Sequence, residues 1–321
     1  MRPLSALPEP DFKLFKLSSK IDFIRYFSFV NKSIDLHLPK SHIEYKPLRA
    51  NGHDGMLMTI HDPDYYDLII VDRELPDATI DAIEVSCDYT PKGKGLPLTE
   101  RHERIEEMRQ WVISHLLPWQ GEGIQAATRV SRGRGHSAHV FKGVIRRRAR
   151  TEETMYYGHS NSMYADRTKP NFASMRLYKK VTDNNGSLLP PKHSCRLELT
   201  LTQLGCNHFG LTSPESIFNF EFREFGQYFR FVNPEIKQPI FSKNVRDRHH
   251  RIVKHLEKEM MREAEETLLR VGSHAASHVE LLNVDRHHRH TEGNRRILHS
   301  LDDLSRRVKK HLQFVREWGS F

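Results

Sequence analysis

The fold is decided by one stretch of sequence, TEETMYYGHSNSMYADRTKPNFASMRLYKKVTDNNGSLLPPKHSCRLELTLTQ, which runs from Thr151 to Gln203. It contains two segments typical of β-strands, MRLYKK and CRLELTL, separated by a polar loop. Turn residues at Asn184, Asn185 and Gly186 predict that the chain reverses direction between the two segments. The loop is longer than a tight two-residue turn, so the sequence predicts adjacent strands joined by a loose hairpin.

The two predicted strands each have one apolar and one polar face, because side chains alternate between the faces of a strand. The apolar positions are Met175, Leu177, Leu197, Leu199 and Leu201. The polar positions are Arg176, Tyr178, Lys180, Arg196, Glu198 and Thr200. We therefore expect the apolar side chains to lie under the sheet and the polar ones to gather on its open side.

This polar face combines a tyrosine with cations and a carboxylate. A free tyrosine ionises near pH ~10, and neighbouring cations favour its phenolate form. Arginine matches the geometry of phosphate oxygens. A glutamate would repel a phosphate, but it can hold a divalent metal that polarises the phosphate. The set indicates metal-assisted transfer of a DNA strand onto Tyr178, with Arg176, Arg196 and Lys180 on the phosphate. Lys179 lies on the other face of its strand and is the weakest of the nearby cations for this role.

The segment resembles the core of the rolling-circle replication initiators of the Rep-trans family, which occur in plasmids and have relatives in phages and conjugative elements. The resemblance is carried by YYGHSNS at Tyr156–Ser162, MRLYKK at Met175–Lys180 and RLELTL at Arg196–Leu201, in the family's order. It covers about a sixth of the chain, and a looser match extends to IDAIEVSCDYTPKG at Ile80–Gly93. The resemblance implies that Tyr178 nicks one strand at an origin and becomes joined to the 5′ end, leaving a 3′ hydroxyl primer. Tyr164 is the main rival for the nucleophile.

The upstream strand supplies further carboxylates for a Mg²⁺ or Mn²⁺ site with Glu198. By alternation, Glu84 and Asp88 share one face of this strand. Asp81 lies at its start, where the resemblance places an acidic residue. The sequence leaves all three as candidates.

The whole chain favours a polyanionic partner and an intracellular location. It has 321 residues, a formal net charge of +9 and a pI of about 9.4, which suit DNA binding. The three cysteines, Cys87, Cys195 and Cys206, form no Cys-x-x-Cys pair, and this fits a reducing cytoplasm. We find neither a signal peptide nor an apolar run long enough for a membrane span.

The pattern along the chain predicts an α+β fold, with an antiparallel sheet core, flanking helices and a C-terminal helical module. Residues 1–76 read as irregular with short strand-like pieces, among them YYDLIIVD; residues 77–242 form the nicking core, and residues 243–321 the basic helical module. Helices are expected at Thr99–Leu117, Ser213–Pro234, Asn244–Val271 and Thr291–Glu317.

Two features of this layout bear on partners. The basic run RRVKKH at Arg306–His311 suits either DNA phosphates or helix-surface ion pairs. The C-terminal module is also a place for a host helicase or a second subunit to dock, and the resemblance implies a homodimer. The alternatives to a replication initiator are a non-catalytic sequence-specific DNA-binding protein and a conjugative relaxase with the same chemistry.

Overall fold

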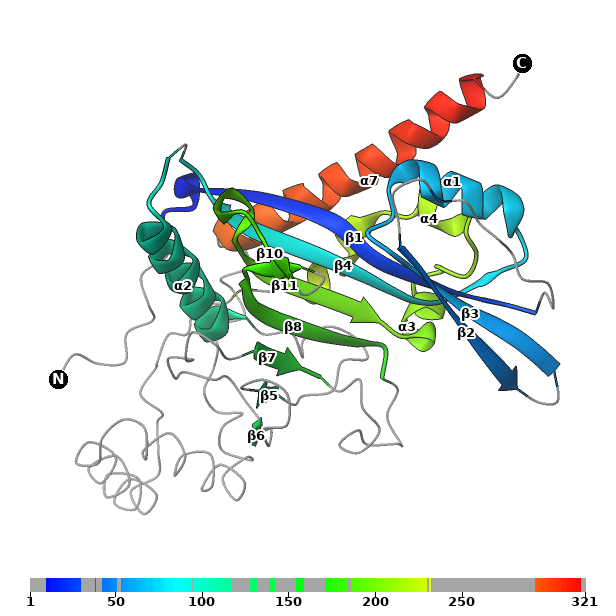
Figure 1. Ribbon diagram of the computed structural model, residues 1–321, viewed down its shortest axis with the longest axis horizontal. Coiled ribbons are helices and arrows are strands. Elements are labelled where there is room, and N and C mark those ends of the chain that lie inside the picture. The colour runs from blue at the N-terminus through cyan, green and yellow to red at the C-terminus, as the bar shows by residue number, and fades with distance from the viewer. Residues whose placement is uncertain are drawn as a thin grey trace, which may run out of the picture.

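In the computed structural model the described residues form a mixed architecture of one large sheet with helices packed on it (Figure 1). The structure describes residues 10–29, 38, 42–50, 53–93, 95–116, 128–131, 139–141, 154–158, 171–183, 186–229, 231 and 292–318. The sheet has nine strands in the order β2-β3-β1-β4-β11-β8-β7-β5-β6, and neighbouring strands are antiparallel. The predicted α+β class is confirmed.

The strands of this sheet come from both halves of the chain. Their bounds are β1 (Phe15–Ser28), β2 (His42–Ala50), β3 (His53–His61), β4 (Thr79–Pro91), β5 (Thr128–Ser131), β6 (His139–Phe141), β7 (Thr154–Tyr157), β8 (Ala173–Lys180) and β11 (Ser194–Leu201). Two short strands, β9 (Thr182–Asp183) and β10 (Gly186–Ser187), form a small ribbon in the connection between β8 and β11. Figure 1 shows β2 and β3 extending away from the rest of the sheet.

One face of the central strands is apolar and covered by helices. Helix α2 (Leu98–His115) contacts β4, β8 and β11, α3 (Gln203–His208) contacts β4 and β11, and α7 (Glu292–Trp318) contacts β1. The remaining helical elements are η1 (Phe12–Leu14), α1 (Tyr65–Glu74), η3 (Pro190–Lys192), α4 (Ser216–Asn219) and η4 (Phe222–Gln227). Alternate residues of the strands are fully buried on this face, including Val85, Cys87, Leu177, Leu197 and Leu199. The three cysteines are free and buried there.

The predicted hairpin is present with the predicted alternation. β8 and β11 pair with Leu177 opposite Leu197 and Arg176 opposite Glu198, so the leucines and the polar groups separate as expected. The helix predicted at Thr99–Leu117 is α2, although Pro97 and not Thr99 stands at its N-cap. The helix predicted at Thr291–Glu317 is α7. The helix predicted at Asn244–Val271 lies outside the described residues.

Three expectations about local structure are wrong. The described part of residues 1–76 is not irregular, because β1, β2 and β3 belong to the same sheet as β4. YYDLIIVD is helix α1, started by a capping box in which Asp64 and Asp67 each accept the other's backbone N–H. The stretch predicted as one helix at Ser213–Pro234 breaks into α4 and η4. Its aromatic side chains are core as expected, since Phe218, Phe222, Phe225 and Phe229 are buried.

Gly205 is the point where α3 approaches the start of β8 most closely. A Cβ added at Gly205 would lie 2.2 Å from the backbone oxygen of Phe172, which cannot move without shifting the strand that follows it. We expect Gly205→Ala to lower the free energy of unfolding by ~1–3 kcal/mol, as overpacking does. The measurement is chemical denaturation. Gly186→Ala is the matched control, because its Cβ would meet nothing closer than 3.4 Å; equal destabilisation of both variants would contradict this account.

Candidate active site

The polar face of the sheet brings side chains from four neighbouring strands into transverse rows. In antiparallel strands, directly paired residues place their side chains on the same face. One row runs from Asp88 on β4 through Arg196 on β11 to Tyr178 on β8. The next row is Ser86, Glu198, Arg176 and Tyr156, and a third contains Glu84 and Thr200. The predicted tyrosine, arginines and glutamates therefore converge.

The Tyr178 hydroxyl lies against a carboxylate. It donates a hydrogen bond to Glu198 Oε1 at 2.6 Å, across the β8–β11 pair. Burial raises the pKa of Tyr178 and the Glu198 carboxylate raises it further, against the opposing effect of Arg196 and Arg176. The phenol is thus protonated at rest, and a base that can take its proton is already in hydrogen-bond contact.

Arg176 bridges two acidic residues on neighbouring strands. Its Nη2 donates to both carboxylate oxygens of Glu84 at 3.0 Å, and its Nε lies 2.7 Å from Glu198 Oε2. The side chain is nevertheless 41% exposed. Arg176 therefore joins the buried carboxylates to the accessible side of the face, where a phosphate could approach.

Arg196 is held more tightly and more deeply. Its Nε and Nη2 donate to the two oxygens of Asp88 at 2.9 and 2.6 Å, a bidentate pair, and its Nη1 donates to Asp22 at 2.8 Å. The Arg196 side chain is only 4% exposed. Asp88 also accepts a hydrogen bond from Ser194 at 2.6 Å. These contacts fix Arg196 under the face, 3.7 Å from Glu198 Oε1.

Asp22, Glu84 and Glu198 form an acidic triad whose ligand atoms all lie within 4.8 Å of one another. Carboxylate oxygens are the ligands of Mg²⁺, Mn²⁺ and Ca²⁺, and oxygens on opposite sides of a Mg²⁺ ion stand ~4.2 Å apart. Glu198 Oε2 is buried and accepts no hydrogen bond, although it is ion-paired with Arg176 Nε. The donor chemistry and the spacing fit a hard divalent cation.

The triad is electrostatically uneven. Burial raises the pKa of Glu198 to about 7, and the nearby Glu84 adds to the shift. Burial likewise raises the pKa of Glu84, against the effect of Arg176. Burial would also raise the pKa of Asp22, but the positive charges of Arg196 and Lys20 have the larger effect, and the pKa of Asp22 is lowered. The pKa shifts therefore favour a proton on the Glu84 and Glu198 side of the triad, with Glu198 titrating near neutral pH.

Asp22 is the triad member that sequence reasoning missed. It is the extra residue of a β-bulge in β1, because Ile21 pairs with Val85 while Phe23 pairs with Glu84, the next residue of β4. The bulge is held by the backbone N–H of Asp62, which donates to the Asp22 carbonyl at 2.7 Å, and by the Lys20 ammonium, 3.1 Å from the Asp22 carboxylate. The sequence did contain a signal for Asp22: in FKLSSKIDFIRYF polar and apolar residues alternate, which places Lys20 and Asp22 on one face of a strand.

The other predicted site residues occupy different places. Asp81 lies at a second bulge of the β1–β4 pair, forms an ion pair with Arg25 at 2.5 Å and is not a member of the triad. Lys180 is buried and pairs with Asp183 at 3.2 Å. Lys179 faces the α2 side, where burial lowers its pKa against the opposing effect of Glu106. Tyr164, the rival nucleophile, lies outside the described residues.

Comparison with known proteins identifies no relative: no protein-family model, curated protein or solved structure matches this chain. Among the helices that the structure describes, none combines the length and the apolarity needed to cross a bilayer.

Titration of Glu198 should change the free energy of unfolding of the protein with pH. Because the pKa of Glu198 is about 7 in the folded protein, above its ordinary value of 4.5, the folded state binds more protons between these pH values, and stability falls as pH rises through this window. Glu198→Gln cannot ionise and escapes this loss. We expect the unfolding free energy of Glu198→Gln relative to the parent to rise by on the order of 3 kcal/mol between pH 4.5 and 7.5.

The measurement is denaturant unfolding across this pH range in the presence of a chelator. Glu103→Gln, at an exposed position of α2, is the control for the general effect of losing a carboxylate. A difference between Glu198→Gln and the parent that stays constant with pH would contradict the assignment.

Proposed function

We propose that this chain is a DNA nicking enzyme that starts rolling-circle replication, with Tyr178 as the nucleophile. The observation that carries the proposal is the contact between the Tyr178 hydroxyl and Glu198 Oε1 at 2.6 Å, within a cluster that also contains two arginines and the acidic triad. A phenol, a base, phosphate-binding cations and donors for a hard cation are the parts that strand transfer to protein requires.

The proposed step uses these groups in order. The Tyr178 oxygen attacks a backbone phosphorus as its proton passes to Glu198. The bond from phosphorus to the 3′ oxygen breaks, and the departing 3′ oxygen takes up the proton that Glu198 received, which leaves a 3′ hydroxyl that can prime synthesis. Tyr178 is left joined to the 5′ phosphate. Asp22, Glu84 and Glu198 would hold Mg²⁺ or Mn²⁺, which supplies Lewis acidity at the phosphate when bound.

The arginines divide the work of binding the phosphate. Arg176 is exposed enough to meet DNA, whereas Arg196 is buried and positions Asp22, Asp88 and Glu198. Lys180 contributes positive charge at the end of the same face, since it helps to lower the pKa of Asp22. The net charge of +9 supports a DNA partner.

Origin specificity, a cytoplasmic location, a host helicase and a homodimer belong to the proposal through the family resemblance alone. A conjugative relaxase would use the same chemistry and differ in the DNA site that it nicks. In a non-catalytic DNA-binding protein, the same contacts would be structural: Tyr178 and Glu198 would form a hydrogen bond and Arg176 an ordinary cross-strand ion pair.

Formation of a covalent protein–DNA adduct distinguishes the nicking enzyme from the non-catalytic DNA-binding protein. With supercoiled DNA that carries the cognate origin and with Mg²⁺, the parent protein should yield a protein–DNA adduct and a nicked circle, and Tyr178→Phe should yield neither. Tyr156→Phe is the matched control, because Tyr156 lies on the same face opposite Arg176. DNA binding by the parent without any adduct would support the non-catalytic reading, and an adduct that persists in Tyr178→Phe but disappears in Tyr164→Phe would move the nucleophile to Tyr164.

The metal ligands can be tested separately from the nucleophile. Asp22→Asn and Glu198→Gln should each raise the Mn²⁺ concentration needed for half-maximal nicking by at least ~10-fold, with DNA affinity retained, because each removes one anionic ligand. Asp81→Asn should leave the Mn²⁺ requirement unchanged, since Asp81 pairs with Arg25. The Mn²⁺ requirement is measured by titrating Mn²⁺ into the nicking reaction, and Mn²⁺ binding to the free protein is measured by calorimetry. A large increase in the Mn²⁺ requirement in Asp81→Asn alone would make Asp81 the metal ligand, as the resemblance implies.

A further inference from the structure

The first half of β1 has an open edge. β1 pairs with β4 from Phe15 to Phe27, but its other neighbour, β3, begins only at Phe23. In the described part of the chain no strand pairs with Phe15–Ile21 on that side. An unpaired strand edge presents backbone donors and acceptors that can bind another extended chain.

The hydrogen-bond pattern shows which backbone groups face the open edge. The Lys92 N–H donates to the Leu14 carbonyl at 2.8 Å, so Leu14 is hydrogen-bonded to the strand beside it. Because hydrogen-bonded and non-hydrogen-bonded pairs alternate along an antiparallel ladder, Phe15, Leu17 and Ser19 turn their backbone groups outward. The Ser19 carbonyl confirms the direction, since Arg307 of α7 donates to it at 2.7 Å.

Arginines of α7 cap both ends of this edge and leave its middle open. Arg307 caps Ser19, and Arg296 donates to the Phe12 carbonyl at 2.8 Å. The Phe15 N–H is used by the Phe12 carbonyl. Phe15 and Ser19 are buried, at 2% and 1% exposure, so what remains accessible to a partner is the N–H and the carbonyl of Leu17, enough for two hydrogen bonds to one extended segment.

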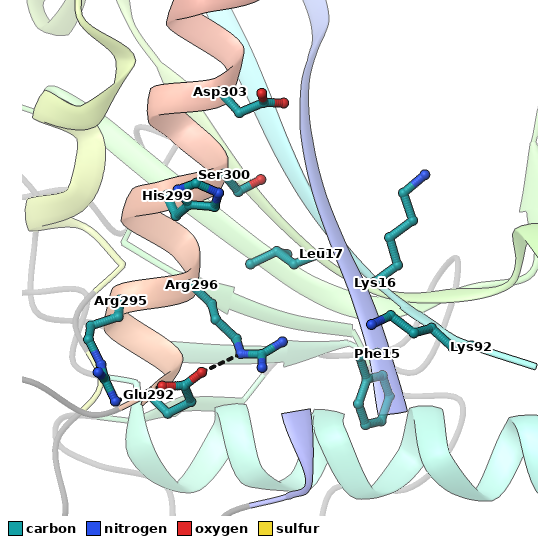
Figure 2. Close-up of a pocket in the computed structure, with 10 residues that line it drawn as sticks. All are labelled: Phe15, Lys16, Leu17, Lys92, Glu292, Arg295, Arg296, His299, Ser300 and Asp303. Atoms are coloured by element: carbon teal, nitrogen blue, oxygen red, sulfur yellow. Dashed lines mark hydrogen bonds and ion pairs between the residues drawn. The ribbon is translucent and has the colours of Figure 1, made fainter. Parts of the chain in front are cut away.

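A cationic groove of about 670 Å³ runs along this open middle, between β1 and the first half of α7. In Figure 2 Leu17 points toward α7, while Lys16 and Lys92 lie on the other side of the β1 ribbon from Arg295, Arg296 and His299. The groove contains two lysines, two arginines and two acidic residues, Glu292 and Asp303. Its net charge is therefore +2, with His299 counted as neutral. Glu292 is paired with both Arg295 and Arg296.

We propose that this groove binds an acidic, extended peptide segment of a partner protein, which adds as a strand to the edge of β1. The N–H and the carbonyl of Leu17 would supply the main-chain hydrogen bonds, as in other cases of strand addition. Cations stand on both faces of the edge, so acidic side chains pointing either way from the added strand would meet positive charge. Lys16 and Lys92 have no ion partner in the part of the chain that the structure describes.

Charge also decides against the nearest alternative, pairing of this edge with the same edge of a second copy. Two grooves of net charge +2 would repel each other, and lysines on an edge strand oppose such self-association. DNA phosphates would match the sign of the groove, but they would leave the backbone groups of Leu17 without a specific role. The proposal does not depend on the nicking reaction, because none of the groove residues belongs to the candidate active site.

The test uses the full chain and a fluorescently labelled peptide, Thr-Val-Glu-Glu-Val-Thr, capped at both ends; its consecutive glutamates point to opposite faces of a strand. Anisotropy should show saturable binding to the parent. Lys16→Glu and Lys92→Glu should each weaken binding by about tenfold, while Lys46→Glu on the exposed β2 should change it little. Hydrogen exchange of the Leu17 amide should slow when the peptide is added.

Each control addresses one part of the proposal. The same peptide with lysines in place of glutamates should not bind, and backbone N-methylation of the acidic peptide should abolish binding by removing its donors. Equal binding of the N-methylated peptide would overturn strand addition. If the labelled peptide fails to bind, or if the lysine substitutions weaken only the binding of a short DNA duplex, the groove is not a peptide site. Concentration-dependent dimerisation of the parent that competes with peptide binding would assign the edge to a second copy instead.

Discussion

The compensation of buried carboxylates by two guanidinium groups is the interaction on which the site depends. Glu84 and Glu198 are almost completely buried, and an ionised carboxylate without a partner is costly in such a place. Arg196 is locked by Asp88 and Asp22, whereas Arg176 reaches the surface. The two arginines therefore differ in freedom: Arg196 is a fixed part of the scaffold, and Arg176 can exchange a carboxylate for a phosphate if a cation takes over the charge of the triad.

The same cluster explains why the Tyr178 phenol is neutral. The Glu198 carboxylate raises the pKa of Tyr178, while its own pKa is raised by burial and by Glu84. A cation held by the triad would favour the ionised form of Glu198, and a phosphate held by Arg176 would free that carboxylate from its ion pair. In the proposed function, substrate binding and activation of the nucleophile are thus linked through one glutamate.

Strand alternation predicted the central part of this site because the pattern of period two is unambiguous in MRLYKK and CRLELTL. It placed Arg176, Tyr178, Arg196 and Glu198 on one face, and the register of β8 with β11 bears this out. Alternation in FKLSSKIDFIRYF places Lys20 and Asp22 on one polar face, but it does not show that β1 pairs with β4. The bulge that brings Asp22 beside Glu84 depends on the Asp62 N–H, just after the end of β3. Alternation also misread YYDLIIVD, whose apolar run suits a strand or a helix until the Asp64 cap is recognised.

β1 connects the candidate active site with the groove. The bulge at Asp22 separates its second half, which is paired on both sides, from its first half, whose other edge pairs with no strand among the described residues. A strand added at Phe15–Ser19 would restrain the backbone that leads into this bulge, and Lys20, which contacts the carboxylates of both Asp22 and Asp62, lies between the two regions. Since edges gain order when they are paired, a partner in the groove would act on the position of Asp22 through continuous backbone rather than through a change in the charge of the triad.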